Sequence, residues 1–395
     1  MFVNGAQQFD PAYSGQPILM GVLGLKVFIG YAPLMICTYY LIRDKAMLVL
    51  CTRLMSIVVI TCCSLAFIQY VLLLTGICPP TQGVGDELFK ASVDTRCFVG
   101  GALLYTPSQG VIRLPGTFVA PWQWGWFMIS GAFLGFATAF NDPKPQWRLV
   151  GLFAMGINFI MAVLSGQRIA LALVPVVTGM LLVMTGQVAN LKRFLPIAII
   201  LGLALTIGAA QNPELVSDRF GSFQSRWKAS PPYAFISHQF EWALNEQRGI
   251  LGNGLGRATN SARVFGVTQL VETYYPKVMY EVGTFGMLLF VGFVSVITLQ
   301  CFKAYRSARD PALRGYGATF WVFVLVNSYN TYYYPLDVDP VSVYYWFLAG
   351  IILKIPVMDR EERDKAKRAA LLEEGHELPL EEPVVPRKKK KATTW

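Results

Sequence analysis

The sequence predicts an all-α, polytopic integral membrane protein of about nine transmembrane helices with one large extracytoplasmic loop. Hydrophobic residues make up 54% of the 395 residues and charged residues only 15%, whereas a soluble domain carries about 25% charged residues. The apolar residues come in blocks of about twenty, the length that a helix needs to cross a ~30 Å hydrocarbon core. The alternating segments of about ten residues that are typical of a β-barrel are absent from the sequence.

Nine apolar blocks are the candidate spanning helices. They cover residues 18–42, 47–77, 118–140, 148–165, 169–186, 194–211, 284–302, 316–333 and 340–357. We expect a helix bundle over residues 1–358, with extracytoplasmic loops at 79–117 and 212–283 and a charged cytoplasmic tail over 359–395. Residues 1–16 lack the basic and short apolar regions of a cleavable signal peptide, so the first block is expected to act as the insertion signal.

Basic residues in the short loops predict the orientation of the bundle. If the nine spans alternate, the following basic residues fall on one side, together with the basic run of residues 387–391: Arg43, Lys45, Arg53, Lys144, Arg148, Lys192, Arg193, Lys303, Arg306, Arg309 and Arg314. The positive-inside rule makes that side the cytoplasm and places the N-terminus outside. Membrane lipids are the expected partners of the basic run. The net charge of +10 is explained in this way, and we expect no nucleic-acid partner.

The seven cysteines show no metal-ligand spacing. Cys78 and Cys97 share one polar loop, and an extracytoplasmic position would let them form a disulfide; the alternative is two free thiols. The sequence contains no HExxH motif, carboxylate cluster or Asp-rich motif, so we expect neither a bound metal nor a cofactor.

Arg168 is the strongest single candidate for a functional residue. It is the only charged residue between Leu149 and Met184, and it lies in the segment Ser165-Gly166-Gln167-Arg168 at the turn between the fourth and fifth blocks. An ionisable residue at the membrane edge indicates function by default, and the planar guanidinium donates two parallel hydrogen bonds to a phosphate. The alternatives are an arginine that reaches to the interface and one that makes a structural pair.

Two further candidates adjoin other apolar blocks. Arg113 precedes a tight turn at Pro115-Gly116 before the third block, where it either binds substrate or anchors the helix at the interface. Glu272 precedes the seventh block; it is either a general base, if burial raises its pKa, or an ion-pair partner of Lys277 or of an arginine.

The loop 212–283 carries the remaining candidate substrate-binding residues, which are Arg248, Gly252, Gly254, Gly256, Arg257 and Lys277. The glycine run does not have the spacing of the dinucleotide-binding fingerprint. It either brings backbone amides to an anion or serves only as a turn. Residues 233–245 have apolar positions at helical spacing, which predicts a helix that lies on the membrane surface or on its own loop.

Four ordered segments resemble the O-antigen ligase and O-antigen polymerase family of bacterial envelope polysaccharide enzymes. They are the segment RLPGTFVAP at 113–121, Ser165-Gly-Gln-Arg168, Ser225-Arg226-Trp227 and the glycine run at 252–256. The resemblance covers about residues 110–350. It implies a GT-C-like bundle in the bacterial inner membrane and a metal-independent inverting glycosyltransferase, which takes a glycan from undecaprenyl diphosphate outside that membrane. Arg168 and Arg226 match the arginines that grip the diphosphate in the family.

The chain departs from the family in one motif. The ligases close the large loop with a His-Asn pair whose histidine is the presumed base, and Glu272-Thr273 occupies the equivalent place here. The difference favours a polymerase, or a relative with another acceptor glycan, over ligation to a lipid-A core. Two alternatives stay open: a solute transporter such as an inorganic-carbon carrier, and a non-catalytic subunit of a polysaccharide assembly. Transporters usually hold polar residues at mid-membrane and show internal repeats, and neither feature is evident in the sequence.

Overall fold

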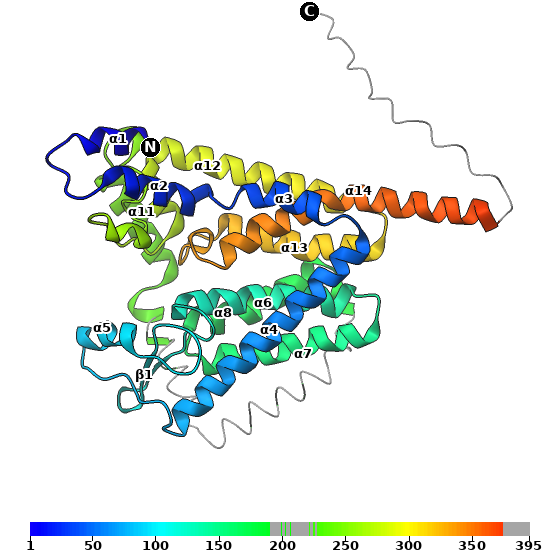
Figure 1. Cartoon of the computed structure of the whole chain (residues 1–395), viewed down its shortest axis with the longest axis horizontal. Coiled ribbons are helices and arrows are strands. Elements are labelled where there is room, and N and C mark those ends of the chain that lie inside the picture. The colour runs from blue at the N-terminus through cyan, green and yellow to red at the C-terminus, as the bar shows by residue number, and fades with distance from the viewer. Residues whose placement is uncertain are drawn as a thin grey trace, which may run out of the picture.

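The computed structural model describes residues 1–189 and 227–373, together with residues 199, 202, 206, 221, 224 and 225. The described chain is mostly helical (Figure 1). Its helices are α1 Phe2–Gln8, α2 Pro17–Ile29, α3 Pro33–Leu41, α4 Lys45–Leu74, α5 Asp86–Asp94, α6 Pro121–Asn141, α7 Pro145–Leu164, α8 Arg168–Met184, α11 Pro232–Glu246, α12 Tyr274–Ser307, α13 Pro311–Tyr329 and α14 Val341–Glu373. Short 3-10 helices are η1 Pro107–Gln109, η3 Gly249–Leu251, η4 Asn260–Val264 and η5 Pro335–Asp337. Two antiparallel strands, β1 Leu104–Thr106 and β2 Val111–Arg113, are paired from Leu104 opposite Arg113.

Apolar helices confirm the membrane class. Among the described residues, four helices, α4, α7, α12 and α14, are long and apolar enough to cross a bilayer, and the pair α2 and α3, bent by 41°, makes a fifth if it is one span. Helices α6, α8 and α13 lie in three more of the predicted blocks. The sixth block, 194–211, lies outside the described residues apart from 199, 202 and 206. The membrane class is therefore shown, while the number nine stays a prediction.

The long helices α4 and α12 expose apolar side chains along their outer faces. The exposed residues include Leu50, Leu54, Ile57, Val58, Phe67, Ile68, Phe285, Leu288, Leu289, Phe293, Val296 and Leu299. Contiguous apolar surface of this size marks a membrane or partner interface rather than a water-facing surface. These faces are where lipid tails would lie.

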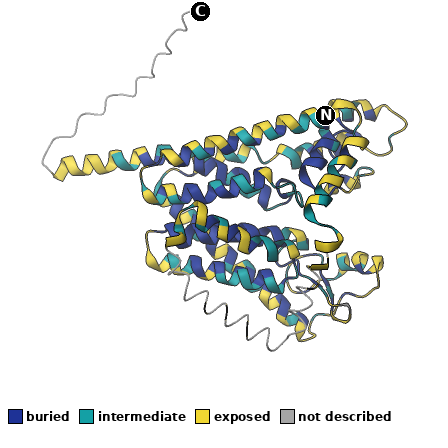
Figure 2. Ribbon diagram, turned by 180° about the vertical axis from the view of Figure 1, so that it is seen from behind, coloured by how far each residue is buried: buried dark blue, intermediate teal, exposed yellow. Residues whose placement is uncertain are grey.

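Helix α6 is the centre of the bundle, and it is buried at almost every position after its first turn (Figure 2). A helix that is apolar all round belongs in the interior of its protein. Small residues let α7 approach it closely, because a Cβ on Gly151 would lie only 2.4 Å from the backbone nitrogen of Ala139. Close backbone contact through small residues is typical of membrane helix pairs.

Three polar contacts gather the short loops with basic residues at one end of the bundle, here called the basic end. Lys45 pairs with Asp310 at 2.6 Å, and Arg53 donates twice to Asp142, at 2.7 and 2.8 Å. Asp359 accepts hydrogen bonds from the backbone nitrogens of residues 309 and 310. The loops after α3, α6 and α12 and the middle of α14 therefore lie at one end of the bundle. Spans that cross the membrane in alternating directions would place them there. Lys192, Arg193 and the tail from 374 onward lie outside the described residues.

The remaining loops meet at the opposite end, here called the loop end, where Figure 1 shows α1, α5, β1 and α11. The amide of Gln16 donates to the carbonyl of Phe265 at 2.7 Å, and the amide of Tyr274 donates to that of Thr331 at 2.7 Å. These bonds tie the N-terminal segment and the α13–α14 loop to the segment before α12. Helix α11 confirms the helix predicted at 233–245.

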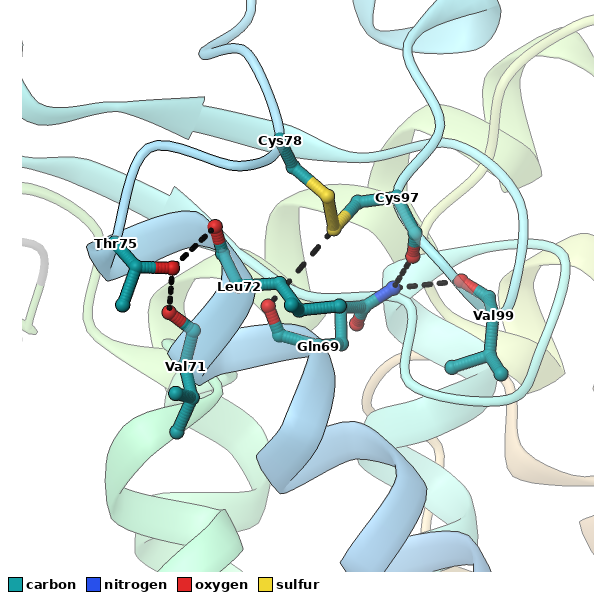
Figure 3. Close-up of a disulfide and its surroundings, with 7 residues drawn as sticks. All are labelled: Gln69, Val71, Leu72, Thr75, Cys78, Cys97 and Val99. Carbon is teal, nitrogen blue, oxygen red and sulfur yellow. Dashed lines mark hydrogen bonds between the residues drawn. A yellow bond between two sulfur atoms is a disulfide. The ribbon is translucent and has the colours of Figure 1, made fainter.

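A disulfide joins Cys78 to Cys97 at the loop end, with their Cα atoms 5.7 Å apart (Figure 3). Beside it, the fully buried Gln69 of α4 donates to the carbonyls of Cys97, at 3.0 Å, and Val99, at 2.6 Å. The disulfide and the amide together hold the loop 79–117 on the end of α4.

Candidate functional site

The turn between α7 and α8 is built around a glycine that no other residue can replace without strain. Gly166 has φ +70°, and a Cβ at that position would lie 1.9 Å from the carbonyl oxygen of Ile112. The amide of Leu114 donates to the carbonyl of Ser165 at 3.0 Å, and Nε2 of Gln167 donates to the carbonyl of Leu114 at 3.5 Å. Two segments that the sequence indicated separately, 113–121 and 165–168, are therefore in direct contact.

This contact brings two of the predicted arginines to one place, here called the turn site: Arg113, the last residue of β2, and Arg168, the first residue of α8. Arg168 is exposed and Arg113 half-buried. The N-terminus of α8, where Arg168 lies, carries partial positive charge and attracts anions. A helix N-terminus and a guanidinium group each attract phosphate.

Aromatic packing holds the segment after Arg113 in place. The amide of Phe118 donates to the carbonyl of Pro115 at 3.0 Å, which confirms the predicted turn, and Gly116 at φ +55° leaves room for the ring of Trp124. The rings of Trp124 and Phe127 stack with centroids 5.4 Å apart. The turn site is thus fixed to the first turns of the most buried helix, α6.

Glu272 is held by its backbone beside a strained loop. Its amide donates to the side chain of Gln239 on α11 at 3.3 Å, and its carbonyl accepts from the amide of Tyr333 at 3.1 Å. Tyr333 and Tyr334 have φ of 54° and 39°, and a non-glycine residue in this region costs about 1–3 kcal/mol. The Glu272 side chain is half-buried.

Lys277 pairs with Asp337 at 2.5 Å, and both side chains are largely buried. Burial raises the pKa of the Asp337 carboxyl, and the adjacent Lys277 ammonium partly offsets the effect. Glu281 accepts two hydrogen bonds at Oε1, from the amide of Ala258 at 2.7 Å and from Oγ1 of Thr259 at 3.0 Å. The partner of Lys277 is therefore Asp337, where the sequence had suggested Glu272. Neither buried carboxylate is predicted as a site residue from the sequence, although each lies beside an apolar block.

The glycine run serves to shape the loop. Gly252, Gly254 and Gly256 have φ of 72°, 98° and 84°. The amides of Asn253 and Gly254 donate to the carbonyls of residues 280 and 281, at 2.8 and 2.9 Å. The amide of Leu255 donates to Oδ1 of Asn4 at 3.0 Å. These three amides are engaged inside the protein, which favours the conformational interpretation of the run over an anion cradle.

Arg248 and Arg257 come together on the ring of Tyr13, 5.1 and 4.8 Å from its centroid. Arg248 lines a pocket of about 400 Å³ between α1 and η3, here called the tyrosine pocket, and Arg257 donates hydrogen bonds to Gln7, another residue of its lining. The pocket is formed by other elements than the turn site. Arg226 lies outside the described residues, so its position relative to either site is not described.

Within the described residues, no group of three or more His, Cys, Asp or Glu side chains is placed to hold a metal ion. No protein-family model matches the chain, and no curated protein matches it. Any function must therefore be argued from the residues themselves.

Proposed function

We propose that the protein is a glycosyltransferase of the membrane that moves a glycan from a polyprenyl diphosphate to an acceptor sugar in surface polysaccharide synthesis. The observation that supports this most is the contact of Leu114 with Ser165, because it brings Arg113 and Arg168 to one turn at the end of the bundle. A lipid-linked diphosphate presents its charge at this level of a bilayer. The resemblance of segments 113–121 and 165–168 to the polysaccharide enzymes points to the same chemistry.

In the proposed reaction an acceptor hydroxyl attacks the anomeric carbon of the donor glycan from the face opposite the diphosphate. The new glycosidic bond forms as the bond from the anomeric carbon to the diphosphate oxygen breaks, and the electron pair leaves with the diphosphate. Arg168 and Arg226 stabilise the charge that develops there, with a contribution from Arg113, and this is the largest electrostatic contribution to such a step. Neither a metal nor a nucleotide takes part.

Glu272 is the proposed base that accepts the proton of the attacking hydroxyl. A base must lie within hydrogen-bond reach of that proton, and the two backbone hydrogen bonds of Glu272 fix its position beside the loop of Tyr333. A glutamate in place of the histidine of the ligases favours a polymerase or a relative with another acceptor.

We further propose that the loop end faces the extracytoplasmic side of a bacterial inner membrane, with the N-terminus outside and the C-terminus in the cytoplasm. The basic residues Arg43, Arg148 and Arg314 at the other end support this orientation through the positive-inside rule. The pair Cys78–Cys97 supports it too, because disulfides persist in oxidising compartments.

Deletion of the gene, followed by complementation, tests the proposal. We expect the deletion to shorten or abolish a surface glycan and to accumulate its lipid-linked intermediate. Wild type and Arg314→Ala, an exposed arginine at the basic end, should restore the glycan, whereas Arg168→Ala should reach the membrane without restoring it. An unchanged glycan in the deletion strain, or loss of solute uptake without any glycan change, would reject the proposal in favour of a transporter.

A further inference from the structure

The N-terminal segment forms one wall of the tyrosine pocket. The pocket is lined by Gln7, Asp10 and Tyr13 on one side and by residues 248–252 on the other. The Oδ1 atom of Asp10 already accepts a hydrogen bond from the amide of Ala12 at 2.9 Å. The charged residues of the lining are thus Arg248 and Asp10, and Arg257 contacts the lining residues Gln7 and Tyr13.

Buried amide side chains of the N-terminal segment form hydrogen bonds with the glycine run. Asn4 is fully buried; its Nδ2 donates to the carbonyls of Pro17 and Leu255 at 3.0 and 2.9 Å. Gln7 is 4% exposed, and its Nε2 donates to the carbonyl of Asn253 at 2.7 Å. Buried polar groups with all their partners in place specify one arrangement, so the pocket is a built feature of the fold.

Arg257 is buried beside this wall, and no carboxylate of the described residues forms an ion pair with it. It is only 8% exposed, and its Nε and Nη2 both donate to the neutral Oε1 of Gln7, at 3.1 and 2.8 Å. In the described part of the chain no carboxylate lies within ion-pair distance of Arg257, and Nη1 has no hydrogen-bond acceptor. Burial lowers the pKa of Arg257. A buried charge is costly unless it is paired, so an anion beside Arg257 would stabilise the protein.

Arg248 supplies a second cation at the same ring. Its side chain is exposed, Nη1 donates to the hydroxyl of Tyr13, and its Cζ lies 5.1 Å from the ring centroid. The ring of Tyr13 stabilises both guanidinium groups through its π face and so holds two like charges close together. An anion between them would relieve their repulsion.

We propose that the tyrosine pocket binds an oxyanion, the phosphate or carboxylate group of a ligand, between Arg248 and Arg257. The planar guanidinium is suited to such groups because it donates paired hydrogen bonds. Gln7 and Tyr13 are positioning residues that orient the two arginines. The site is separate from the turn site and does not depend on glycosyl transfer. Its oxyanion comes either from a lipid headgroup or from a soluble or glycan-borne acid.

Binding of inorganic pyrophosphate and of glucuronate to the purified full-length protein in neutral detergent tests the proposal. Calorimetry at constant ionic strength should show saturable binding of at least one of the two anions. Arg248→Ala should weaken it by about tenfold or more, as expected for a lost charged hydrogen bond. Arg257→Gln should abolish it. Arg263→Ala is the matched control, an exposed arginine of the same loop outside the pocket, and should bind as wild type does.

Two further measurements keep the result decisive. Asp10→Asn removes the only carboxylate of the pocket lining and should tighten anion binding, which tests the site even if Arg257→Gln fails to fold. Pyrophosphate binding is also compared between nanodiscs of phosphatidylglycerol and nanodiscs of phosphatidylcholine. Weaker binding in phosphatidylglycerol assigns the oxyanion to a lipid headgroup, whereas equal binding assigns it to a soluble or glycan-borne acid. Absence of saturable binding of both anions, or equal binding by wild type and Arg248→Ala, overturns the proposal.

Discussion

The amide of Leu114 donates a 3.0 Å hydrogen bond to the carbonyl of Ser165, and this bond joins the loop before α6 to the turn between α7 and α8. Helices α6 and α7 lie between the two residues in the chain. The bond therefore depends on the packing of both helices and of the turn itself, and it places Arg113 and Arg168 at the same end of the protein.

Gly166→Ala should separate these two segments. The new methyl group would collide with the carbonyl of Ile112, 1.9 Å from its ideal position, at a φ that alanine rarely adopts. Strain of this kind costs about 1–3 kcal/mol before the collision is counted. We expect a lower unfolding temperature in detergent and loss of the glycan in complementation.

Gly179→Ala is the control for this substitution. Gly179 lies inside α8, and a Cβ there would meet nothing within 4 Å. Alanine is preferred to glycine in a helix interior by about 1 kcal/mol, so stability should be equal or slightly higher. A wild-type unfolding temperature for Gly166→Ala would contradict the geometry of the turn.

Lys277→Met should destabilise the protein by about 3–5 kcal/mol, because it leaves the carboxylate of Asp337 buried without its partner. The double variant Lys277→Met, Asp337→Leu should recover much of that loss. Thermal unfolding in detergent measures both effects. Lys365→Ala, which breaks the exposed pair with Glu362, should leave the unfolding temperature unchanged. Equal stability of the Lys277→Met variant and wild type would show that the buried pair is absent.

Asp310→Asn should lower stability in a pH-dependent way. Burial pushes the pKa of Asp310 upward, but hydrogen bonds from Lys45 and from the amide of Leu313 outweigh it, and the pKa is lowered from 3.8. A carboxyl with a lowered folded-state pKa stabilises the protein above its unfolded pKa, and that contribution is lost as the pH falls through the folded value. The difference in unfolding temperature between wild type and variant should therefore be constant above about pH 5 and shrink below pH 3.8.

Asp364→Asn is the control for the pH series. Asp364 is exposed on α14 and should behave as wild type at every pH. A difference for Asp310→Asn that grows as the pH falls would have the wrong sign and would contradict the Lys45–Asp310 pair.

The Cys78–Cys97 pair should report the orientation of the loop end. In a variant that keeps only these two cysteines, an impermeant maleimide should label intact cells only after an impermeant reductant has been added. Labelling that requires lysis of the cells would place the loop in the cytoplasm. Replacing both cysteines by alanine should cost about 3 kcal/mol of stability, from the loop that they close.

The helical membrane class could be predicted from the sequence because apolar blocks of spanning length have few alternatives in lipid. The α7–α8 turn at Ser165–Gly166 and the turn at Pro115–Gly116 could be predicted as well, since a local glycine or proline signal specifies each one. The contact between the two turns could not, because it depends on how α6 and α7 pack.

Two parts of the candidate sites could not be predicted from the sequence, because they also depend on contacts between distant segments. The pairing of Lys277 with Asp337 joins residues from different helices, and no spacing rule connects them. The sequence of residues 1–16 is polar and does not indicate a buried segment. In the structure, however, Asn4 and Gln7 bury their amides against the loop 253–257. A lone Asn or Gln in a polar stretch carries no signal of a distant backbone partner.

The most direct test of the proposed transferase is glycan extension by the purified protein reconstituted with a polyprenyl-diphosphate-linked glycan and no nucleotide or metal. We predict extended product with inverted anomeric configuration for wild type. Arg168→Ala should lower its rate by about 100-fold or more, and Glu272→Gln should lower kcat with little change in the KM for donor. Equal rates for wild type, Arg168→Ala and Glu272→Gln, or no product from the wild-type protein, would contradict the account.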